Sequence, residues 1–266
     1  MAVDDFIGIT AIVGEEGTGK TSMALSYPRS IRHFDIDVGG YKRAAWRMNC
    51  ESITTKSYPK PIQMNKLLGQ TEVSSRIQIP KKVEGMKKLW QDVVIDFVAA
   101  CQDKEVATIV LDSATLLWSI CHNSRLEELQ EIQAYKWKKE HPNTPMDENE
   151  YREKLLAIEY GPANEKMTSL LQTARAFGKN LVLTHYPTDV YGAMPDGKGN
   201  MVEAKTGEKT LDGVKNTAKL VDLVVWTSIK EVIKGGKKNK VPICKITKCG
   251  IEGMGLAAVG LEVPAT

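Results

Sequence analysis

Several features that mark whole classes of protein are missing from this chain of 266 residues. No apolar run approaches the ~20 residues that a membrane-spanning helix needs. The first residues lack the basic segment that opens a secretion signal. The cysteines are odd in number and form no C-x-x-C pair, which argues against a disulfide framework or a zinc site: Cys50, Cys101, Cys121, Cys244 and Cys249. We therefore expect a cytoplasmic protein with reduced thiols and no membrane partner.

Charge excess and aromatic content are also small. The chain has 36 basic and 33 acidic side chains, for a net charge of +3, and 6% aromatic residues. So mild a balance does not by itself indicate a polyanionic partner. Isolated aromatic residues such as Tyr186 and Tyr191 are the only candidates for stacking on nucleic-acid bases.

A phosphate-binding loop is clearly present. Residues 14–21 read G-E-E-G-T-G-K-T and follow the apolar run 6–13, which predicts a strand. Glycines let consecutive backbone N–H groups point at a phosphate, and the following helix N-terminus adds positive potential. We expect Lys20 to reach the β- and γ-phosphates and Thr21 to ligate Mg²⁺. The predicted ATP-binding residues are Gly14, Glu15, Glu16, Gly17, Thr18, Gly19, Lys20, Thr21 and Ser22.

The order of apolar segments predicts an α/β fold. Further strand-length apolar runs recur at 31–37, 106–112, 180–185 and 221–227. Helical patterns fall between most of them, at 40–49, 83–101, 115–140 and 148–177. This alternation favours a mostly parallel sheet.

One domain over 1–266 is the organisation we expect. It would carry a helical insertion around 119–160 and a mobile polar loop around 187–219. A C-terminal β-hairpin is predicted around the turn at 235–236, followed by a final strand at 256–263.

A second element of the phosphate site is the strand that ends in Asp112. Residues 107–113 read A-T-I-V-L-D-S, and a carboxylate at the C-terminal edge of such a strand can hold the Mg²⁺ shell. The alternative is a helix cap. ATPases of the broad AAA+ type usually carry a water-activating Glu next, but here the residue is Ser113. The water-activating group is therefore expected from another strand end.

Taken together, these motifs resemble the RecA-like ATPases, most specifically the small phage RecA-like ATP-binding proteins linked to recombination and single-strand annealing. The resemblance covers most of the chain. It implies a three-layer sandwich in which the 180–185 strand lies between the P-loop strand and the Asp112 strand. It also implies Mg²⁺-dependent ATP hydrolysis stimulated by DNA or assembly, with single-stranded DNA, further copies of the chain in a filament or ring, and a single-strand-binding protein as partners.

The resemblance assigns three more residues. Asp37 stands where RecA proteins carry the catalytic glutamate, as general base, as support for Mg²⁺, or alternatively as a helix cap. His185 occupies the position that senses the γ-phosphate, with a structural histidine as the alternative. Lys248 matches lysines that reach the nucleotide of a neighbouring subunit, or is an edge-strand charge. The 187–219 loop would order on nucleic acid or be merely solvated.

Two other functions fit the same motifs. A P-loop kinase for a small acceptor would use the 119–160 segment as a lid, with charges from Arg125, Arg152 and Arg175. A nucleotide-gated binding module would hydrolyse ATP slowly or not at all.

Overall fold

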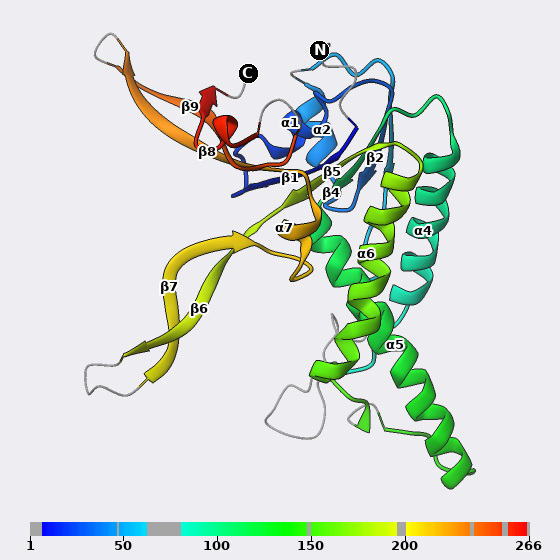
Figure 1. Cartoon of the computed structure of the whole chain (residues 1–266). Helices are drawn as coiled ribbons and strands as arrows, with labels where there is room; N and C mark the ends of the chain where they lie inside the picture. The colour runs from blue at the N-terminus through cyan, green and yellow to red at the C-terminus, as the bar shows by residue number, and fades with distance from the viewer. Residues whose placement is uncertain are drawn as a thin grey trace.

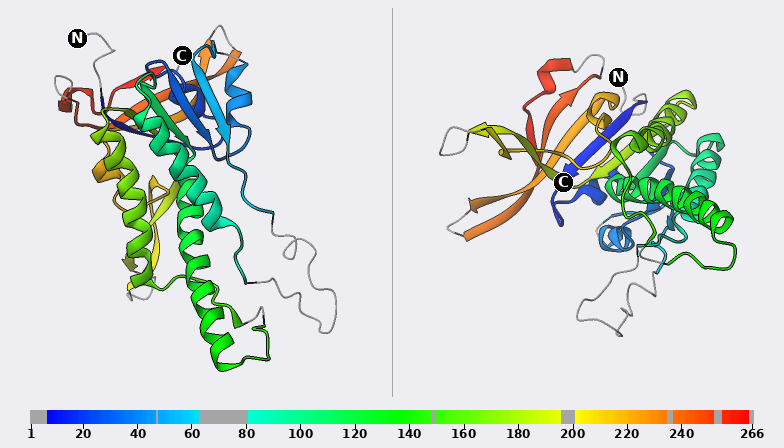
Figure 2. Two further views of the ribbon diagram at one scale, coloured as in Figure 1. Left: turned by 90° about the vertical axis from the view of Figure 1, so that its right-hand side faces the viewer. Right: turned by 90° about the horizontal axis from the view of Figure 1, so that it is seen from below.

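A computed structural model of the chain describes residues 7–46, 48–62, 81–147, 150–195, 201–234, 237–251 and 255–264. A mostly parallel sheet runs through the centre, with helices on both faces (Figures 1 and 2). Its strands lie in the order β10-β9-β8-β1-β5-β4-β2-β3. Their bounds are β1 Ile9–Gly14, β2 Ile31–Asp35, β3 Ile53–Ser57, β4 Thr108–Asp112, β5 Asn180–His185, β8 Leu223–Lys234, β9 Lys237–Cys249 and β10 Glu262–Pro264.

Strands β3, β2, β4, β5, β1 and β8 pair in parallel, while β9 and β10 are antiparallel. The β5 strand lies between β1 and β4, so the predicted strand order is confirmed. The helices are α1 Lys20–Ala24, α2 Gly40–Ala45, α4 Met86–Gln102, α5 Ala114–Glu140, α6 Tyr160–Ala176 and α7 Thr217–Leu220, with 3-10 turns η3 Ala157–Glu159 and η4 Gly255–Ala258.

The sheet separates two hydrophobic cores because side chains alternate along each strand. On one face, Ile9, Ala11 and Val13 of β1 belong to the larger core, which includes buried residues of α4, α5 and α6. On the other, Ile12 packs in a smaller core with Ala24 and with residues of α2, β4 and β5. The predicted three-layer α/β sandwich is confirmed. Within the described residues, no helix is both long and apolar enough to cross a membrane.

The predicted helical insertion at 119–160 has a different form. Helix α5 starts directly after β4 and continues unbroken for 27 residues, extending beyond α4 and α6 (Figure 1). The Ser113 hydroxyl accepts a hydrogen bond from the Leu116 N–H at 3.3 Å, so Ser113, not Asp112, caps this helix. Helix α6 begins at Tyr160 instead of 148. An Arg152–Glu159 ion pair holds the irregular segment before it.

The prediction of a loop over 187–219 is wrong for most of that range. Strands β6 Pro187–Pro195 and β7 Met201–Leu211 form an antiparallel ribbon that projects from the body (Figure 1), and α7 follows. Most of its described side chains are exposed on both faces. Because neither face is buried, the sequence shows no alternation of apolar and polar residues that would predict these strands. Residues 196–200 lie outside the described part.

At the C-terminus, the predicted hairpin is confirmed as β8 and β9, while its turn at 235–236 lies outside the described residues. The final strand predicted at 256–263 is partly wrong, since η4 occupies its first half and only Glu262–Pro264 pair with β9. Strand β3 was not predicted. It lies at the sheet edge with mostly exposed polar residues.

We expect the larger core to dominate stability. Phe97 on α4 is fully buried with its ring centroid 6.2 Å from that of Phe34 on β2. Phe97→Ala should lower the unfolding free energy by about 3–5 kcal/mol because it leaves a cavity. Ile95→Ala, on the same helix but 65% exposed, should stay within about 0.5 kcal/mol of the parent. Urea denaturation of the three proteins measures both values, and equal losses would contradict this placement of the core.

Candidate functional site

The loop at 14–21 joins β1 to α1, and its glycines are required for different structural reasons. Gly17 and Gly19 have φ values of 76° and 93°, in the region that favours glycine. A Cβ on Gly14 would lie 2.2 Å from the Thr227 hydroxyl oxygen and 2.7 Å from the Thr227 carbonyl oxygen on β8. The first glycine therefore permits close packing against β8, and the other two permit the turn.

Lys20 is buried at the centre of this loop. Its Nζ donates hydrogen bonds to the carbonyl oxygens of Gly14 and Glu15, each at 2.8 Å. The same ammonium lies 4.3 Å from the ring centroid of Tyr186. Burial lowers the pKa of Lys20, and the carboxylate of Asp112 opposes that shift most strongly. The loop thus holds a cation that is ready to exchange carbonyl oxygens for phosphate oxygens.

Asp112 lies beside Lys20, at the end of β4, with its carboxylate 4% exposed. Thr21 donates a hydrogen bond to Oδ2 at 2.6 Å, and Thr184 on β5 donates to Oδ1. The His33 Nε2 atom lies 3.5 Å from Oδ2. Burial acts to raise the pKa of Asp112, but these neighbours outweigh it and hold the pKa below its usual value. Asp112 is therefore a buried carboxylate, fixed at the Thr21 hydroxyl.

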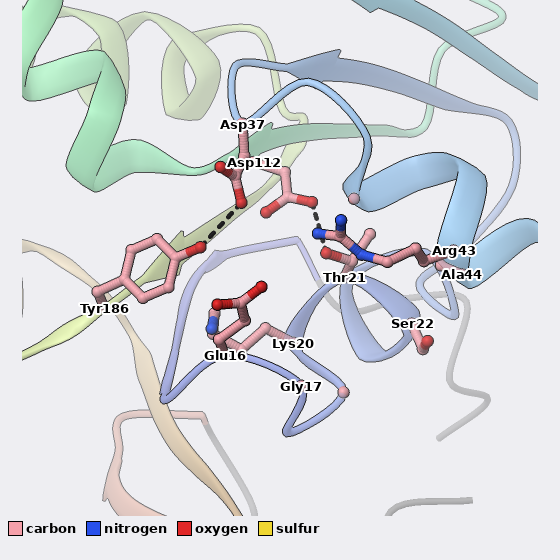
Figure 3. A pocket seen from close by; sticks show the side chains of 12 residues that line it. Glu16, Gly17, Lys20, Thr21, Ser22, Asp37, Arg43, Ala44, Asp112 and Tyr186 are labelled. Carbon is pink, nitrogen blue, oxygen red and sulfur yellow. Dashed lines mark hydrogen bonds between the residues drawn. The ribbon is translucent and has the colours of Figure 1, made fainter.

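The two aspartates at the end of β2, Asp35 and Asp37, have different roles. Asp35 is buried, and its Oδ2 accepts hydrogen bonds from the Gly39 N–H at 3.1 Å and the Ser57 hydroxyl at 3.3 Å, which shapes the turn into α2. Asp37 reaches the P-loop side, where its Oδ2 accepts a 2.8 Å hydrogen bond from the Tyr186 hydroxyl (Figure 3). Burial, with Asp37 beside it, raises the pKa of Tyr186, so the phenol keeps its proton.

These groups line one cavity of about 240 Å³ (Figure 3). Its lining residues are Glu16, Gly17, Gly19, Lys20, Thr21, Ser22, Asp37, Gly40, Arg43, Ala44, Asp112 and Tyr186. Most of the predicted ATP-binding residues, together with Asp37 and Asp112, thus meet at one place. The hydroxyl of Thr21 and the carboxylate of Asp112 are hard oxygen donors of the kind that Mg²⁺ takes. Among the described residues, no group of three or more His, Cys, Asp or Glu side chains could hold a metal ion by itself.

His185 does not belong to this cavity, so its predicted sensor role is wrong. Its side chain is buried on the opposite face of the sheet, among residues of α5, α6 and α7. Its Nδ1 lies 2.8 Å from the Asp212 carbonyl oxygen, while the buried Nε2 has no hydrogen-bond partner among the described residues. Because side chains alternate along a strand, the neighbours Thr184 and Tyr186 face the P-loop instead.

Lys248 makes its contacts within its own chain. Its Nζ donates to the carbonyl oxygens of Ala218, Lys219 and Val221, at 2.9, 3.2 and 2.6 Å. These carbonyls lie at the C-terminal end of α7, where a cation satisfies free acceptors. The ammonium is thus held within its own chain, and its contact with the nucleotide of a neighbouring subunit stays a prediction.

Three polar or charged side chains at the site were not assigned to it from the sequence: Thr184, Tyr186 and Arg43. The first two follow from the period of two along β5 and the residue after it, once one face is known. Arg43 lies one helical turn after Gly40, and its side chain runs from α2 toward Thr21 and Asp112 (Figure 3). Among the described residues, no hydrogen bond or ion pair engages its guanidinium.

The arginines of the proposed kinase lid are engaged elsewhere. Arg125 pairs with Glu128, Arg152 with Glu159, and Arg175 with Asp222. None of the three lines the P-loop cavity. The described structure therefore offers no lid charge from these residues.

Comparison with known proteins agrees with this geometry. A family model described as AAA domain matches residues 9–244, which is most of the chain. The matched range includes the P-loop, Asp37, Asp112 and Tyr186. A search of curated proteins finds no match. The family match and the P-loop cavity identify a nucleotide-binding domain of the ATPase type.

The burial of His185 predicts a loss of stability in acid. Burial lowers the pKa of His185 from 6.5 to about 4. As the pH falls below 6.5, the unfolded chain binds a proton that the folded chain does not, so the unfolding free energy should fall, by about 3 kcal/mol down to pH 4. His185→Asn should remove most of this dependence. His141→Asn, at an exposed position, is the control, and equal pH slopes in all three proteins would contradict the prediction.

Proposed function

Since the chain belongs to the AAA domain family, we propose that it is a Mg²⁺-dependent ATPase of RecA type that acts on single-stranded DNA in strand annealing or recombination, as its resemblance to phage proteins implies. The proposal includes assembly of several copies on DNA, with a single-strand-binding protein as a further partner. ATP binding is its best-supported part, because one cavity joins the P-loop, a carboxylate beside the P-loop threonine, and a second carboxylate.

The position of Asp37 is the observation that carries the hydrolytic part. Asp37 comes from the end of β2, on the far side of β4 from β5, yet its carboxylate lies in the P-loop cavity. Ser113 caps α5 and leaves no carboxylate next to Asp112. Of the other carboxylates in the cavity, Asp112 is held by Thr21 and Thr184, and Glu16 is exposed. Asp37 is therefore the group suited to take a proton from the water that attacks the γ-phosphate. The Tyr186 hydroxyl orients this carboxylate.

The remaining groups would bind the triphosphate. When bound, Mg²⁺ would neutralise charge on the β- and γ-phosphates, held by Thr21 and Asp112. Lys20 would follow the phosphates with its ammonium. Among the charged side chains that line the cavity, three carboxylates face only two cations, Lys20 and Arg43. Arg43 lies on the Thr21 side, and we assign it to the γ-phosphate, because a guanidinium can make two parallel hydrogen bonds to phosphate oxygens.

The kinase alternative has no support in the cavity, since its lid arginines are paired elsewhere. A binding module without hydrolysis remains the competing function, and turnover separates the two. Parent protein should release phosphate from ATP in the presence of Mg²⁺, and faster with single-stranded DNA.

Lys20→Ala should abolish ATP binding or turnover and keep the thermal unfolding curve close to that of the parent, because the change removes the main phosphate cation. Phosphate release and nucleotide binding are measured on the same samples. Unchanged ATP affinity in this variant would contradict the P-loop assignment. Tight ATP binding by the parent without turnover, with or without DNA, would favour the binding module.

Arg43 gives a finer test of the site. Arg43→Ala should weaken binding of a non-hydrolysable ATP analogue by about tenfold and leave ADP affinity nearly unchanged, because only the γ-phosphate reaches this side. Lys42→Ala removes the exposed neighbouring charge on α2 and serves as the matched control. Calorimetric titration measures both nucleotides. If Arg43→Ala weakens ATP and ADP equally, Arg43 does not recognise the γ-phosphate.

A further inference from the structure

The net positive charge of the chain is concentrated on one hairpin. Residues 230–240 hold five lysines and one glutamate. The other 255 residues hold 31 of the 36 basic and 32 of the 33 acidic side chains, so without this segment the chain would be slightly acidic. The mild overall charge therefore conceals a strongly basic site.

This segment forms the outer part of β8 and β9, which extends beyond the sheet. Strand β1 pairs with β8 only over Leu223–Thr227, and β10 pairs with β9 only over Ile243–Lys245. Residues 228–234 of β8 and 237–242 of β9 pair only with each other, as an arm that projects from the body (Figures 1 and 2). We name these two stretches the β8–β9 arm. From Ser228 to Val232, successive side chains are exposed, so both faces of the arm are open.

The lysines lie on both faces of the arm. Lys230 lies opposite Val241, and Lys240 lies opposite Glu231. Because Lys230 and Glu231 are consecutive residues of one strand, these two cross-strand pairs point to opposite faces of the arm. Lys230 has one distant partner, Glu262 at 3.5 Å, and Lys238 has Glu231 at 3.7 Å. Such exposed pairs contribute little, so the charges of Lys230 and Lys238 are available to a ligand. Lysines that protect a sheet edge would lie along the sheet, but these lie beyond it.

We propose that the β8–β9 arm is a nucleic-acid-binding element that contacts the phosphodiester backbone. This inference rests on the DNA partner in the proposed function and assigns the site of that contact. Clustered lysines neutralise phosphates and release counterions, and a two-stranded ribbon is narrow enough to enter a DNA groove. The arm contains no aromatic residue, so it binds single and double strands without base preference. Lysines on both faces do not suit a membrane surface, which would require one basic and one apolar face.

The arm replaces the 187–219 segment as the proposed DNA site, because that segment holds five acidic and five basic side chains and has no net charge. Within it, residues 187–211, the range from the start of β6 to the end of β7, hold four acidic and three basic side chains. The exposed apolar residues of that ribbon include Tyr191, Met194 and Met201. A ribbon with a slight negative charge has no electrostatic attraction for a polyanion.

The arm also begins next to the phosphate-binding loop. Thr227, the last β8 residue paired with β1, lies beside the P-loop, with its hydroxyl oxygen 2.7 Å from that of Thr18. DNA bound along the arm would lie on an element that packs directly on the phosphate-binding loop. Coupling between DNA and ATP turnover therefore has a short structural route.

The test removes charge but keeps the apolar part of each side chain. The arm variant combines Lys230→Gln, Lys238→Gln and Lys240→Gln. The control combines Lys136→Gln, Lys138→Gln and Lys139→Gln, which removes three exposed or partly exposed lysines at the far end of α5. Fluorescence anisotropy with a 30-nucleotide single strand and the matching duplex, over a series of salt concentrations, measures affinity and its salt dependence. Vesicles with and without anionic lipid test a membrane surface.

We expect the arm variant to bind both oligonucleotides about tenfold or more weakly, with the slope of log K against log[salt] reduced by about 2 for the single strand. Its basal ATP turnover should match the parent, while the DNA stimulation is lost. The control should behave as the parent. Equal DNA binding by arm variant and parent, or an equal loss in the control, would overturn the assignment.

Failure of the proposed function has a different outcome. If the parent hydrolyses ATP but binds neither oligonucleotide, the DNA partner itself is wrong. Binding to anionic vesicles without binding to DNA would make the arm a membrane element and would also overturn the proposal. If the parent binds DNA and only the arm variant fails, both stand.

Discussion

The buried carboxylate of Asp112 is the constraint on which the site depends. A buried charge is costly unless hydrogen bonds satisfy it, and Asp112 has neighbours from three other segments: Thr21 on α1, Thr184 on β5 and His33 on β2. These contacts fix the P-loop helix relative to three adjacent strands at their C-terminal edge. Gly40 completes the arrangement, because a Cβ there would lie 3.1 Å from the Asp112 carboxylate. The same carboxylate thus limits where α2 can begin.

The parts of the site that could be predicted are those whose chemistry lies in contiguous residues. The P-loop can be recognised from its glycine spacing followed by Lys20 and Thr21. Asp112 can be recognised from its place at the end of an apolar strand. The alternation of strands and helices predicts the layered fold. The strand order came from the resemblance to RecA-like proteins, and the structure confirms it.

The remaining parts depend on which face a residue occupies. Every residue of β5 is buried, so no alternation in its sequence shows which side chains face the P-loop, and the prediction selected His185 instead of Thr184 and Tyr186. The strands of the β6–β7 ribbon were not predicted for the opposite reason: both faces of the ribbon are exposed, so its sequence also lacks alternation. Arg43 reaches the cavity only because tertiary contacts set the start of α2. Lys248 satisfies carbonyls of α7, a helix too short to predict.

The β8–β9 arm and the β6–β7 ribbon begin on either side of the P-loop cavity, and each is connected directly to residues that contact the P-loop. The β8–β9 arm begins after Thr227, which contacts Thr18 of the P-loop. The β6–β7 ribbon begins after Tyr186, whose ring covers the Lys20 ammonium, and its Lys209 forms an ion pair with Glu15. A phosphate that drew Lys20 away from the loop carbonyls would also change the contact between the Lys20 ammonium and the Tyr186 ring. Nucleotide bound as proposed would therefore act at the bases of both elements, of which one is basic and the other exposes apolar side chains.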